Sequence, residues 1–283
     1  MRKEVNNNDL ERINAAWNKL EPLMDETPKQ NFKLKPLFIK KLAIAAALIL
    51  ISSIALLLFN AKKEQVQFVT KYGQTLKVVL PDSSTVYLNG NSKLSYINNW
   101  DNNSDREVKV DGEAYFSVKH TKSNQKFFVR MADNLSVEVL GTEFNITKRG
   151  KNTQVVLSSG KIDFHMNNLK KGNDVVQMKP GDLIEYQNNS KSYIKQKVDP
   201  TTYSSWKSNR IIFNKTKIID VLQNLQYTYG LKVKIEDEKM MNMRVSGSAP
   251  TNNIQSLVDA LSETFNVKFI LKGDSIVLKN KQP

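Results

Sequence analysis

Residues 74–97, "QTLKVVLPDSSTVYLNGNSKLSYI", decide the fold of the larger part of the chain. The stretch consists of short runs rich in Val, Leu, Tyr and Thr, which Pro-Asp-Ser and Asn-Gly-Asn interrupt. Within it, Val86 and Leu88 alternate with Thr85 and Tyr87, as in a strand with one buried face. Short strands separated by tight turns are therefore expected here.

The same pattern continues as far as Asp199. It recurs in "REVKVDGEAYFSVK" (106–119), "KFFVRMADNLSVEVLGTEFNITKRG" (126–150), "TQVVLSSGKIDFHM" (153–166) and "VVQMKPGDLIEYQ" (175–187), and no stretch between residues 64 and 199 favours a long helix. Pro81-Asp82 and Pro180-Gly181 suit turns, because Pro fixes φ and Gly tolerates a positive φ. We predict an all-β domain over residues 60–200, either a sandwich or coiled sheets packed on each other.

Gly112 and Glu113 stand out within the longest of these runs. Gly112 is expected where a strand bends or another backbone comes close. Glu113 lies between this glycine and the apolar "AYF", so we expect its carboxylate to make a buried hydrogen bond. The spacing offers no second carboxylate or base beside it, which argues against a catalytic role.

An internal repeat follows in residues 201–283. Shifting "IIDVLQNLQYTYGLKVKI" by 36 positions, from Ile218 to Ile254, aligns it with "IQSLVDALSETFNVKFIL". Each copy has helical spacing first and strand alternation after it. Gly230 and Asn266 take the same place after each predicted helix, where a left-handed residue ends it. With strands "RIIFN" and "MRVSGSA" before the helices, we predict an α+β module of order β-α-β-β-α-β, closed by "DSIVLK".

Residues 40–60, "KKLAIAAALILISSIALLLFN", form the most apolar stretch. Residues 42–59 carry no charge, and as a helix they would span about 27 Å, close to the hydrocarbon thickness of a bilayer. A buried core helix or a cleaved export signal fits less well, because the stretch has no polar face and no A-x-A site. We predict one transmembrane helix over residues 42–59, with a cytoplasmic N-terminus and the C-terminal domains outside. Lysines flank both ends, so the charge rule favours this orientation only weakly.

Composition excludes several function classes. There is no cysteine, and the two histidines, His120 and His165, stand alone, so neither a metal site nor a cofactor is expected. The net charge of +14 comes from scattered lysines and not from a basic groove with aromatics, which disfavours nucleic-acid binding. We find no G-x-S-x-G, H-E-x-x-H or P-loop pattern and predict no enzyme.

Residues 1–41 contain one helix signal. Asn8 can cap a helix, with Glu11 three residues later, and Pro22 is expected to stop it. Apolar residues recur at spacings of three and four on one side: Leu10, Ile13, Trp17 and Leu20. Such a short helix is marginal alone, so it lies on the membrane surface or docks into a partner. Its balanced polar side favours a partner, with Trp17 as the anchor.

Several of these stretches resemble the FecR family of membrane-anchored anti-sigma regulators in Gram-negative bacteria. "LPDSSTVYLNGNSKLSY" is similar to the family's L-P-D-G-S-x-V-x-L-N-x-x-S-x-L-x-Y, and "REVKVDGEAYFSV" to R-x-V-x-L-x-G-E-A-Y-F-x-V. "VEVLGTEFNI" is similar to V-x-V-L-G-T-x-F-N-V, and "MKPGDLIEY" to a later L-x-P-G-x turn. Ser83 departs from the usual Gly, which puts the geometry of that turn in doubt.

The C-terminal module resembles the short N-terminal domain of secretins and TonB-dependent transducers, and the module that follows the FecR domain in many relatives. The resemblance implies two partners. An extracytoplasmic-function sigma factor would bind the N-terminal helix through Leu10, Ile13, Trp17 and Leu20. The signalling domain of a TonB-dependent outer-membrane transporter would bind the periplasmic domains, where a sheet edge can accept a strand. Residues 1–41 form a shorter segment than the anti-sigma domain of many relatives.

Gly141-Thr142 has two interpretations. The first is a glycine at a bulge followed by a strand-forming threonine. The second is self-cleavage, in which the threonine hydroxyl attacks the unhindered glycine carbonyl, as the resemblance implies because some FecR-like proteins break at such a bond. No flanking base is evident in the sequence. The structural interpretation is favoured.

The expected function is therefore that of a single-pass inner-membrane regulator that relays the state of a transporter to a sigma factor. An alternative is an envelope structural or adhesive, glycan-binding protein with a membrane tether. A tether has no use for an apolar helix side centred on Trp17, which favours the regulator.

Overall fold

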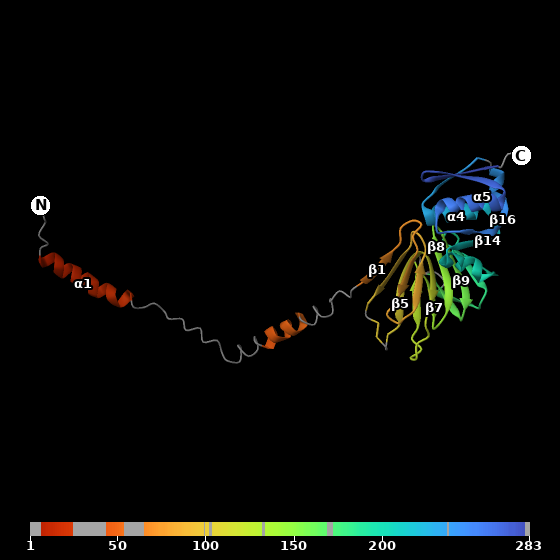
Figure 1. Ribbon diagram of the computed structural model, residues 1–283. Coiled ribbons are helices and arrows are strands. Elements are labelled where there is room, and N and C mark those ends of the chain that lie inside the picture. The colour runs from red at the N-terminus through yellow and green to blue at the C-terminus, as the bar shows by residue number, and fades with distance from the viewer. Residues whose placement is uncertain are drawn as a thin grey trace. The chain divides into compact units, whose positions relative to one another are not determined.

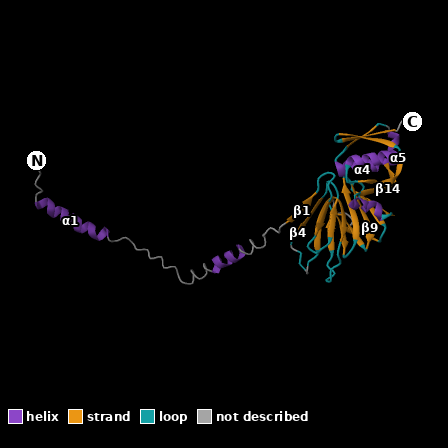
Figure 2. Ribbon diagram, in the orientation of Figure 1, coloured by secondary structure: helices purple, strands orange, loops and turns teal. Residues whose placement is uncertain are grey.

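The computed structural model describes residues 7–24, 44–53, 65–98, 100–101, 104–131, 134–168, 172–236 and 238–280. The chain divides into two compact units, Met1–Lys62 and Lys63–Pro283. The first contains helix α1 (Asn7–Met24) and a helical segment at residues 44–53. The second contains the strands that the structure describes, together with the helices that follow them (Figures 1 and 2).

Helix α1 is longer than the sequence predicts at both ends. Asn8 lies inside the helix and not at its cap, because the helix already begins at Asn7. Pro22 also lies inside the helix, which continues to Met24. A proline near the end removes one backbone hydrogen bond but leaves the later residues able to bond to the preceding turn. The expected stop at Pro22 is therefore wrong.

The predicted transmembrane helix is described only in part. Residues 44–53 are helical, and their large apolar side chains are exposed, among them Ile44, Leu48 and Ile51. Residues 42–43 and 54–59 lie outside the described ranges. Within those ranges, no helix is both long enough and apolar enough to cross a bilayer. The span over residues 42–59 stays a prediction.

Thirteen strands between residues 65 and 197 form one curled sheet, which we call the β body. They are β1 (Gln65–Val69), β2 (Leu76–Val79), β3 (Thr85–Leu88), β4 (Lys93–Ile97), β5 (Arg106–Ser117), β6 (Phe127–Arg130), β7 (Leu135–Val139), β8 (Glu143–Arg149), β9 (Asn152–Ser159), β10 (Ile162–Asn168), β11 (Gly172–Met178), β12 (Asp182–Gln187) and β13 (Ser192–Lys197). No helix is described between β1 and β13, as the sequence predicts.

Strand β5 joins the two halves of the β body. Its first half pairs with β4 and β6, from which the sheet continues through β7 and β10 to β11. Its second half pairs with β3 and β8, from which the sheet continues through β9 and β12 to β13. The two halves enclose a core to which Val108, Val110, Ala114 and Phe116 of β5 contribute. The coiled, packed sheets are therefore confirmed.

Gly112 lies where β5 passes from one half to the other, with φ at +94°. A Cβ on Gly112 would lie 2.7 Å from the Cα of Ser92, so no other residue fits without movement. Ser83 also adopts a positive φ, +65°, and its N–H donates to the Leu80 carbonyl across the Pro81-Asp82 turn. The turn therefore forms although serine replaces the usual glycine.

Strands β11 and β13 end the path of neighbouring strands that runs through both halves of the sheet. Asp182 at the start of β12 is buried, and its carboxylate lies 2.8 Å from the Lys197 ammonium and 3.1 Å from the Lys195 ammonium. Lys195 Nζ also donates to the Gln177 carbonyl of β11, 2.7 Å away. Lys195 thus connects the edge strands β11 and β13.

The stability of the β body should fall between about pH 4 and pH 2 through Asp182. Burial alone would raise the pKa of Asp182, but the two lysines and the N–H of Lys179 lower it to about 2 from 3.8. A lowered pKa stabilises the fold above the unfolded pKa, and this contribution is lost as the pH falls. Asp182→Asn should cost on the order of 1 kcal/mol at pH 7 and flatten this part of the profile. Urea unfolding at each pH measures it, with exposed Asp174→Asn as control; equal profiles would contradict the assignment.

The C-terminal module begins after a short connector, α3 (Pro200–Ser204) and η1 (Ser205–Ser208), which the sequence did not suggest. The module contains β14 (Arg210–Lys217), α4 (Ile218–Tyr229), β15 (Lys232–Ile235), η2 (Glu238–Asn242), β16 (Arg244–Pro250), α5 (Ile254–Phe265), β17 (Val267–Lys272) and β18 (Ser275–Asn280). The order of helices and strands is the predicted one. Gly230 and Asn266 end the two helices in the left-handed conformation, with φ of 73° and 55°.

The strands of the module form two small sheets and not one. The strands that precede the helices, β14 and β16, pair with each other. The strands that follow the helices, β15 and β17, lie on either side of β18. Apolar side chains of both sheets and both helices form one core. Strand β18, which closes the module, thus lies between β15 and β17, the equivalent strands of the two repeats.

Candidate functional site

Helix α1 carries the four residues predicted to bind a partner. Leu10, Ile13, Trp17 and Leu20 are 47%, 59%, 61% and 47% exposed, and Met24 continues the spacing at 69%. We call these five residues the apolar stripe. Spacings of three and four place them on one side of a helix about 27 Å long. An exposed stripe of this kind is typical of helices that dock into an apolar groove.

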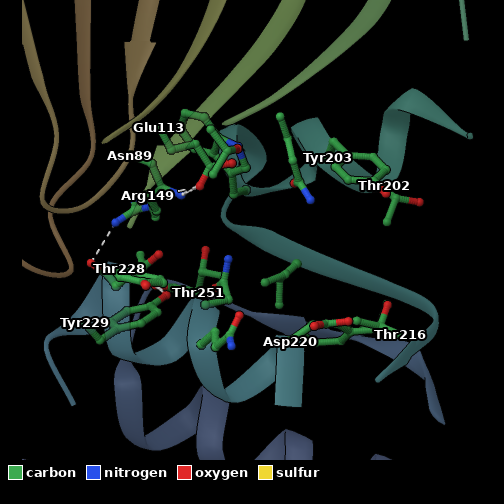
Figure 3. A pocket seen from close by; sticks show the side chains of 18 of the residues that line it. Asn89, Glu113, Arg149, Thr202, Tyr203, Thr216, Asp220, Thr228, Tyr229 and Thr251 are labelled. Atoms are coloured by element: carbon green, nitrogen blue, oxygen red, sulfur yellow. Dashed lines mark hydrogen bonds and ion pairs between the residues drawn. The ribbon is translucent and has the colours of Figure 1, made fainter. Parts of the chain in front are cut away.

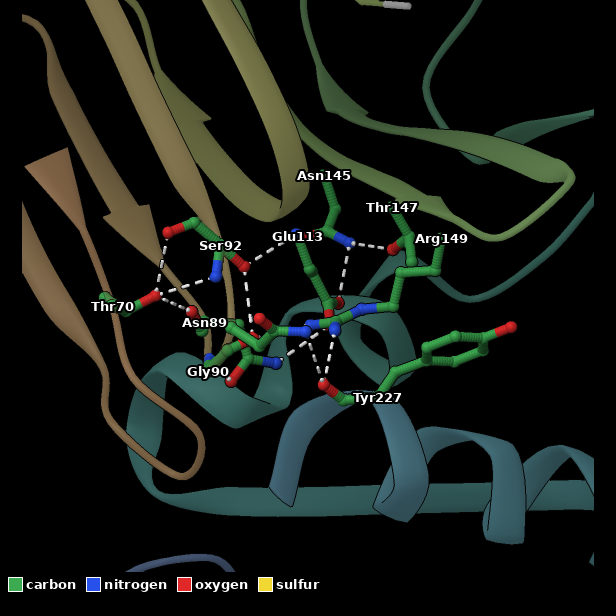
Figure 4. Close-up of polar contacts among 10 residues, drawn as sticks. Thr70, Asn89, Gly90, Ser92, Glu113, Asn145, Thr147, Arg149 and Tyr227 are labelled. Atoms are coloured by element: carbon green, nitrogen blue, oxygen red, sulfur yellow. Dashed lines mark hydrogen bonds and ion pairs between the residues drawn. The ribbon is translucent and has the colours of Figure 1, made fainter. Parts of the chain in front are cut away.

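Glu113 makes the buried hydrogen bonds that the sequence predicts. The residue is 5% exposed, and its carboxylate accepts from Asn89 Nδ2 at 2.8 Å and from Asn145 Nδ2 at 3.1 Å (Figure 4). Its backbone N–H donates to the hydroxyl of Ser92. Glu113 therefore fixes the β3–β4 turn against strand β8.

Arg149, at the end of β8, connects the β body to the C-terminal module. Its Nη2 donates to the Gly90 carbonyl at 2.9 Å, and its Nη1 donates to the Tyr227 carbonyl of α4 at 2.8 Å (Figure 4). The Glu113 carboxylate lies 3.9 Å away. Burial lowers the pKa of the Arg149 guanidinium, and the charge of Glu113 opposes this shift. A cation at the C-terminus of a helix also interacts favourably with the helix dipole.

Three glycines allow the helix end to approach the β body closely. A Cβ on Gly90 would lie 2.5 Å from the Thr228 carbonyl oxygen. A Cβ on Gly230 would lie 2.9 Å from the Tyr72 ring, and one on Gly150 would lie 2.7 Å from the Tyr227 hydroxyl. We call the contacts of residues 227–230, at the C-terminal end of α4, with the β body the α4 junction.

A cleft of about 920 Å³ lies beside the α4 junction, between the β body, the connector and the outer side of α4 (Figure 3). Tyr203, Trp206 and Tyr229 line it together with many amide and hydroxyl side chains. Burial raises the pKa of Tyr229 to about 12. Burial also raises the pKa of Tyr203, as do the charges of Glu185 and Asp220. Both phenols therefore stay neutral hydrogen-bond donors at physiological pH.

The Gly141-Thr142 bond lies in a tightly packed part of the β body. A Cβ on Gly141 would lie 2.7 Å from the Cβ of His120. Thr142 is 3% exposed, and its Oγ1 donates to the Lys161 carbonyl at 2.9 Å. A carbonyl cannot accept the proton that nucleophilic attack would release. The geometry therefore agrees with a structural role for this pair.

The full-length chain should stay intact at Gly141-Thr142 in cells. Wild type and Thr142→Ala should run as single bands of equal length on a denaturing gel. Thr142→Ser retains a hydroxyl and serves as the matched control. Two fragments from wild type that merge into one band in Thr142→Ala would show self-cleavage and contradict this expectation.

The two histidines lie in different parts of the β body. His165 Nε2 lies 3.1 Å from Glu138 Oε2 across strands β10 and β7, and His120 is exposed. In the described ranges, no group of three or more acidic or histidine side chains could hold a metal ion.

Arg149 and the α4 junction were not predicted from the sequence. One signal was present: a glutamate expected to be buried in an apolar run requires donors or a cation nearby. The sequence spacing does not identify which lysine or arginine lies near the Glu113 carboxylate. The junction joins residues far apart in the chain, such as Gly73 and Thr228, and local patterns do not show such contacts.

Comparisons with known proteins agree with this architecture. Two crystal structures of a candidate anti-sigma factor from Parabacteroides distasonis match the chain, each with a TM-score of 0.64. They are 23% and 22% identical to it and cover 77% of this chain and 100% of their own. At this identity the likeness shows the fold. The comparison with curated proteins gives no match.

Two family models match separate parts of the chain. The model described as FecR protein matches residues 66–163, within the β body, and the model described as FecR, C-terminal, matches residues 210–278, within the C-terminal module. Both parts are joined in one compact unit with the fold of the matched crystal structures. The chain therefore belongs to the FecR family.

Proposed function

We propose that this chain is an anti-sigma regulator that holds an extracytoplasmic-function sigma factor through α1. The apolar stripe carries the proposal: five large apolar side chains on one side of an 18-residue helix are 47% to 69% exposed. Membership of the FecR family and the likeness to crystal structures of a candidate anti-sigma factor support the same role.

The apolar residues 42–59 would anchor the chain in the inner membrane. In this arrangement α1 lies in the cytoplasm, where sigma factors are, and the β body with the C-terminal module lies in the periplasm. The uncharged length of the stretch supports the anchor. The orientation follows from the proposed partners of α1.

The periplasmic part would relay the state of a TonB-dependent outer-membrane transporter. Strands β15 and β17 each have one neighbour, β18, so each leaves one edge free of pairing in its sheet. A free edge can accept a strand from another protein through backbone hydrogen bonds. The signalling domain of such a transporter is the proposed source of that strand.

Affinity capture tests the assignment of α1. Residues 1–41, displayed on a matrix, should recover a sigma factor from a lysate of the source cells. Residues 63–283 should recover none. Recovery by residues 63–283 alone would contradict the proposed role of α1.

A further inference from the structure

Near the C-terminus of α4, the carbonyl groups of Tyr227 and Thr228 accept hydrogen bonds from the β body and not from the C-terminal module. A helix leaves its final carbonyls without partners inside the helix. The Tyr227 carbonyl accepts from Arg149 Nη1 and from Asn91 Nδ2, at 2.8 and 3.3 Å. The Thr228 carbonyl accepts from the N–H of Gly73 at 2.8 Å. The Gln226 carbonyl, one residue earlier, is bonded within the module, by the N–H of Gly230.

The internal repeat gives a comparison inside the same chain. Thr264 of α5 is equivalent to Thr228 of α4 under the shift that aligns Ile218 with Ile254. Thr228 is 4% exposed, whereas Thr264 is exposed. Both helices have the same length and the same kind of left-handed end. Burial at the end of α4 is therefore a property of its docking and not of the repeat.

The α4 junction holds the turn that follows β1. Gly73, whose N–H meets α4, and Tyr72, whose ring lies against Gly230, belong to this turn. Strand β1 pairs with β4 alone, and its residues alternate between exposed and half-buried. Strand β1 is therefore an edge strand, which β4 and the packing of Val66 and Phe68 against the core hold on one side only. It is also the first strand after residues 42–59.

The closed junction also contains polar groups without a partner. Arg149 Nε and the Thr228 hydroxyl are buried with no hydrogen-bond partner in the described part of the chain, and so is the indole N–H of Trp206 beside the cleft. Each such group costs free energy that hydration would recover if the surfaces separated. The junction thus combines strong hydrogen bonds with groups that favour opening.

From these contacts we propose that the α4 junction is a releasable latch that controls the order of strand β1. When α4 is docked, it holds the Tyr72-Gly73 turn and keeps β1 paired with β4. A partner that moves the C-terminal module breaks the three donor contacts to α4 together. Release then frees β1 to separate from β4. The latch itself is inferred from these contacts alone. That a signalling partner opens it rests on the proposed function.

Hydrogen exchange of the full-length chain tests the latch with two independent variants. Arg149→Met removes the donors and keeps most of the side-chain length. Gly90→Ala leaves Arg149 in place but sets a methyl group 2.5 Å from the Thr228 carbonyl oxygen and 2.9 Å from the Gly73 nitrogen, so it separates this donor and acceptor directly. In both variants, amides of residues 65–75 and 226–230 should exchange roughly tenfold faster or more, while those of β8 and β9 keep their rates. Arg130→Met, whose pairing with Glu107 lies on β6, is the matched control and should change neither segment.

Three outcomes would overturn the latch. If residues 226–230 keep their exchange rate in both variants, Arg149 and Gly90 do not hold α4. If these residues exchange faster but residues 65–75 do not, docking does not control β1. If the whole β body exchanges faster in both variants, the junction only stabilises the fold. Should Arg149→Met fail to fold, the exchange of the β1 residues 65–69 in Gly90→Ala decides, because the new methyl group meets Gly73 directly. A chain that captures no sigma factor but shows the predicted exchange would contradict the proposed function and leave the latch standing.

Discussion

Replacing Arg106 with Met should lower the free energy of unfolding of the β body by about 3–5 kcal/mol. Arg106 is 1% exposed, and its guanidinium lies over the Phe127 ring at 5.2 Å. Its Nη1 donates to Asp82 Oδ2 at 2.5 Å and to the Lys119 carbonyl at 2.9 Å. Its Nη2 donates to two further carbonyls, those of Gln125 and Leu140.

The large effect is expected because the substitution leaves buried polar groups without their hydrogen-bond donors. Methionine fills much of the space but offers no donor, so the buried Asp82 carboxylate loses its cation and the carbonyls lose their partners. Urea unfolding of residues 63–283 measures the change. Arg130→Met, which breaks a half-exposed pair with Glu107, should cost less than about 1 kcal/mol. Equal effects of the two substitutions would show that Arg106 does not hold the loops together.

Asp82→Asn combined with Arg106→Met gives a sharper measurement of the pair. The stability effects of substitutions within one hydrogen-bond network are not additive. The double variant should therefore lose less free energy of unfolding than the two single variants lose together. Additive effects would mean that Arg106 acts through the carbonyls and not through Asp82.

Joint replacement of Ile13 and Trp17 with Ala should weaken sigma-factor binding by about 100-fold or more. Both side chains lie near the centre of the apolar stripe, where a docked partner excludes water most completely. Tryptophan is the residue whose truncation most often costs more than about 2 kcal/mol at an interface. Titration of labelled full-length protein with the captured sigma factor measures the affinity.

The matched control changes the other side of the same helix. Arg12 and Lys19 are exposed and lie away from the stripe, so their joint replacement with Ala should leave the affinity within about threefold. The helix propensity of alanine keeps α1 formed in both variants. If the control weakens binding as much as the stripe variant, charge and not apolar contact drives the association.

Features that depend on neighbouring residues in the chain were predicted from the sequence. The helices α4 and α5 each contain 12 residues and begin at Ile218 and Ile254, as the repeat requires. Gly230 and Asn266 adopt the left-handed conformation because helix ends favour it and these residue types tolerate it. The buried hydrogen bonds of Glu113 were also predicted, because a carboxylate between apolar neighbours needs donors.

Features that depend on distant contacts were not predicted. The partners of Arg106 lie in three separate loops, β2–β3, β5–β6 and β7–β8, and those of Arg149 come from both domains. The division of the module into two sheets depends on β18 inserting between β15 and β17, which alternation within a strand does not show. Pro22 was misjudged because a proline removes one hydrogen bond of the helix without ending it, and the helix continues to Met24.

Strand β5, which belongs to both halves of the β body, limits how this chain can vary in length. An extra residue in a hairpin loop is absorbed at the surface. An extra residue in β5 would turn every later side chain of the strand to the opposite face, so that Ala114 and Phe116 would leave the core and take the face that Glu113 and Tyr115 occupy. Insertions and deletions should therefore accumulate in the outer loops, and the spacing between Arg106 and Ser117 should stay constant even among distant descendants of the same ancestor.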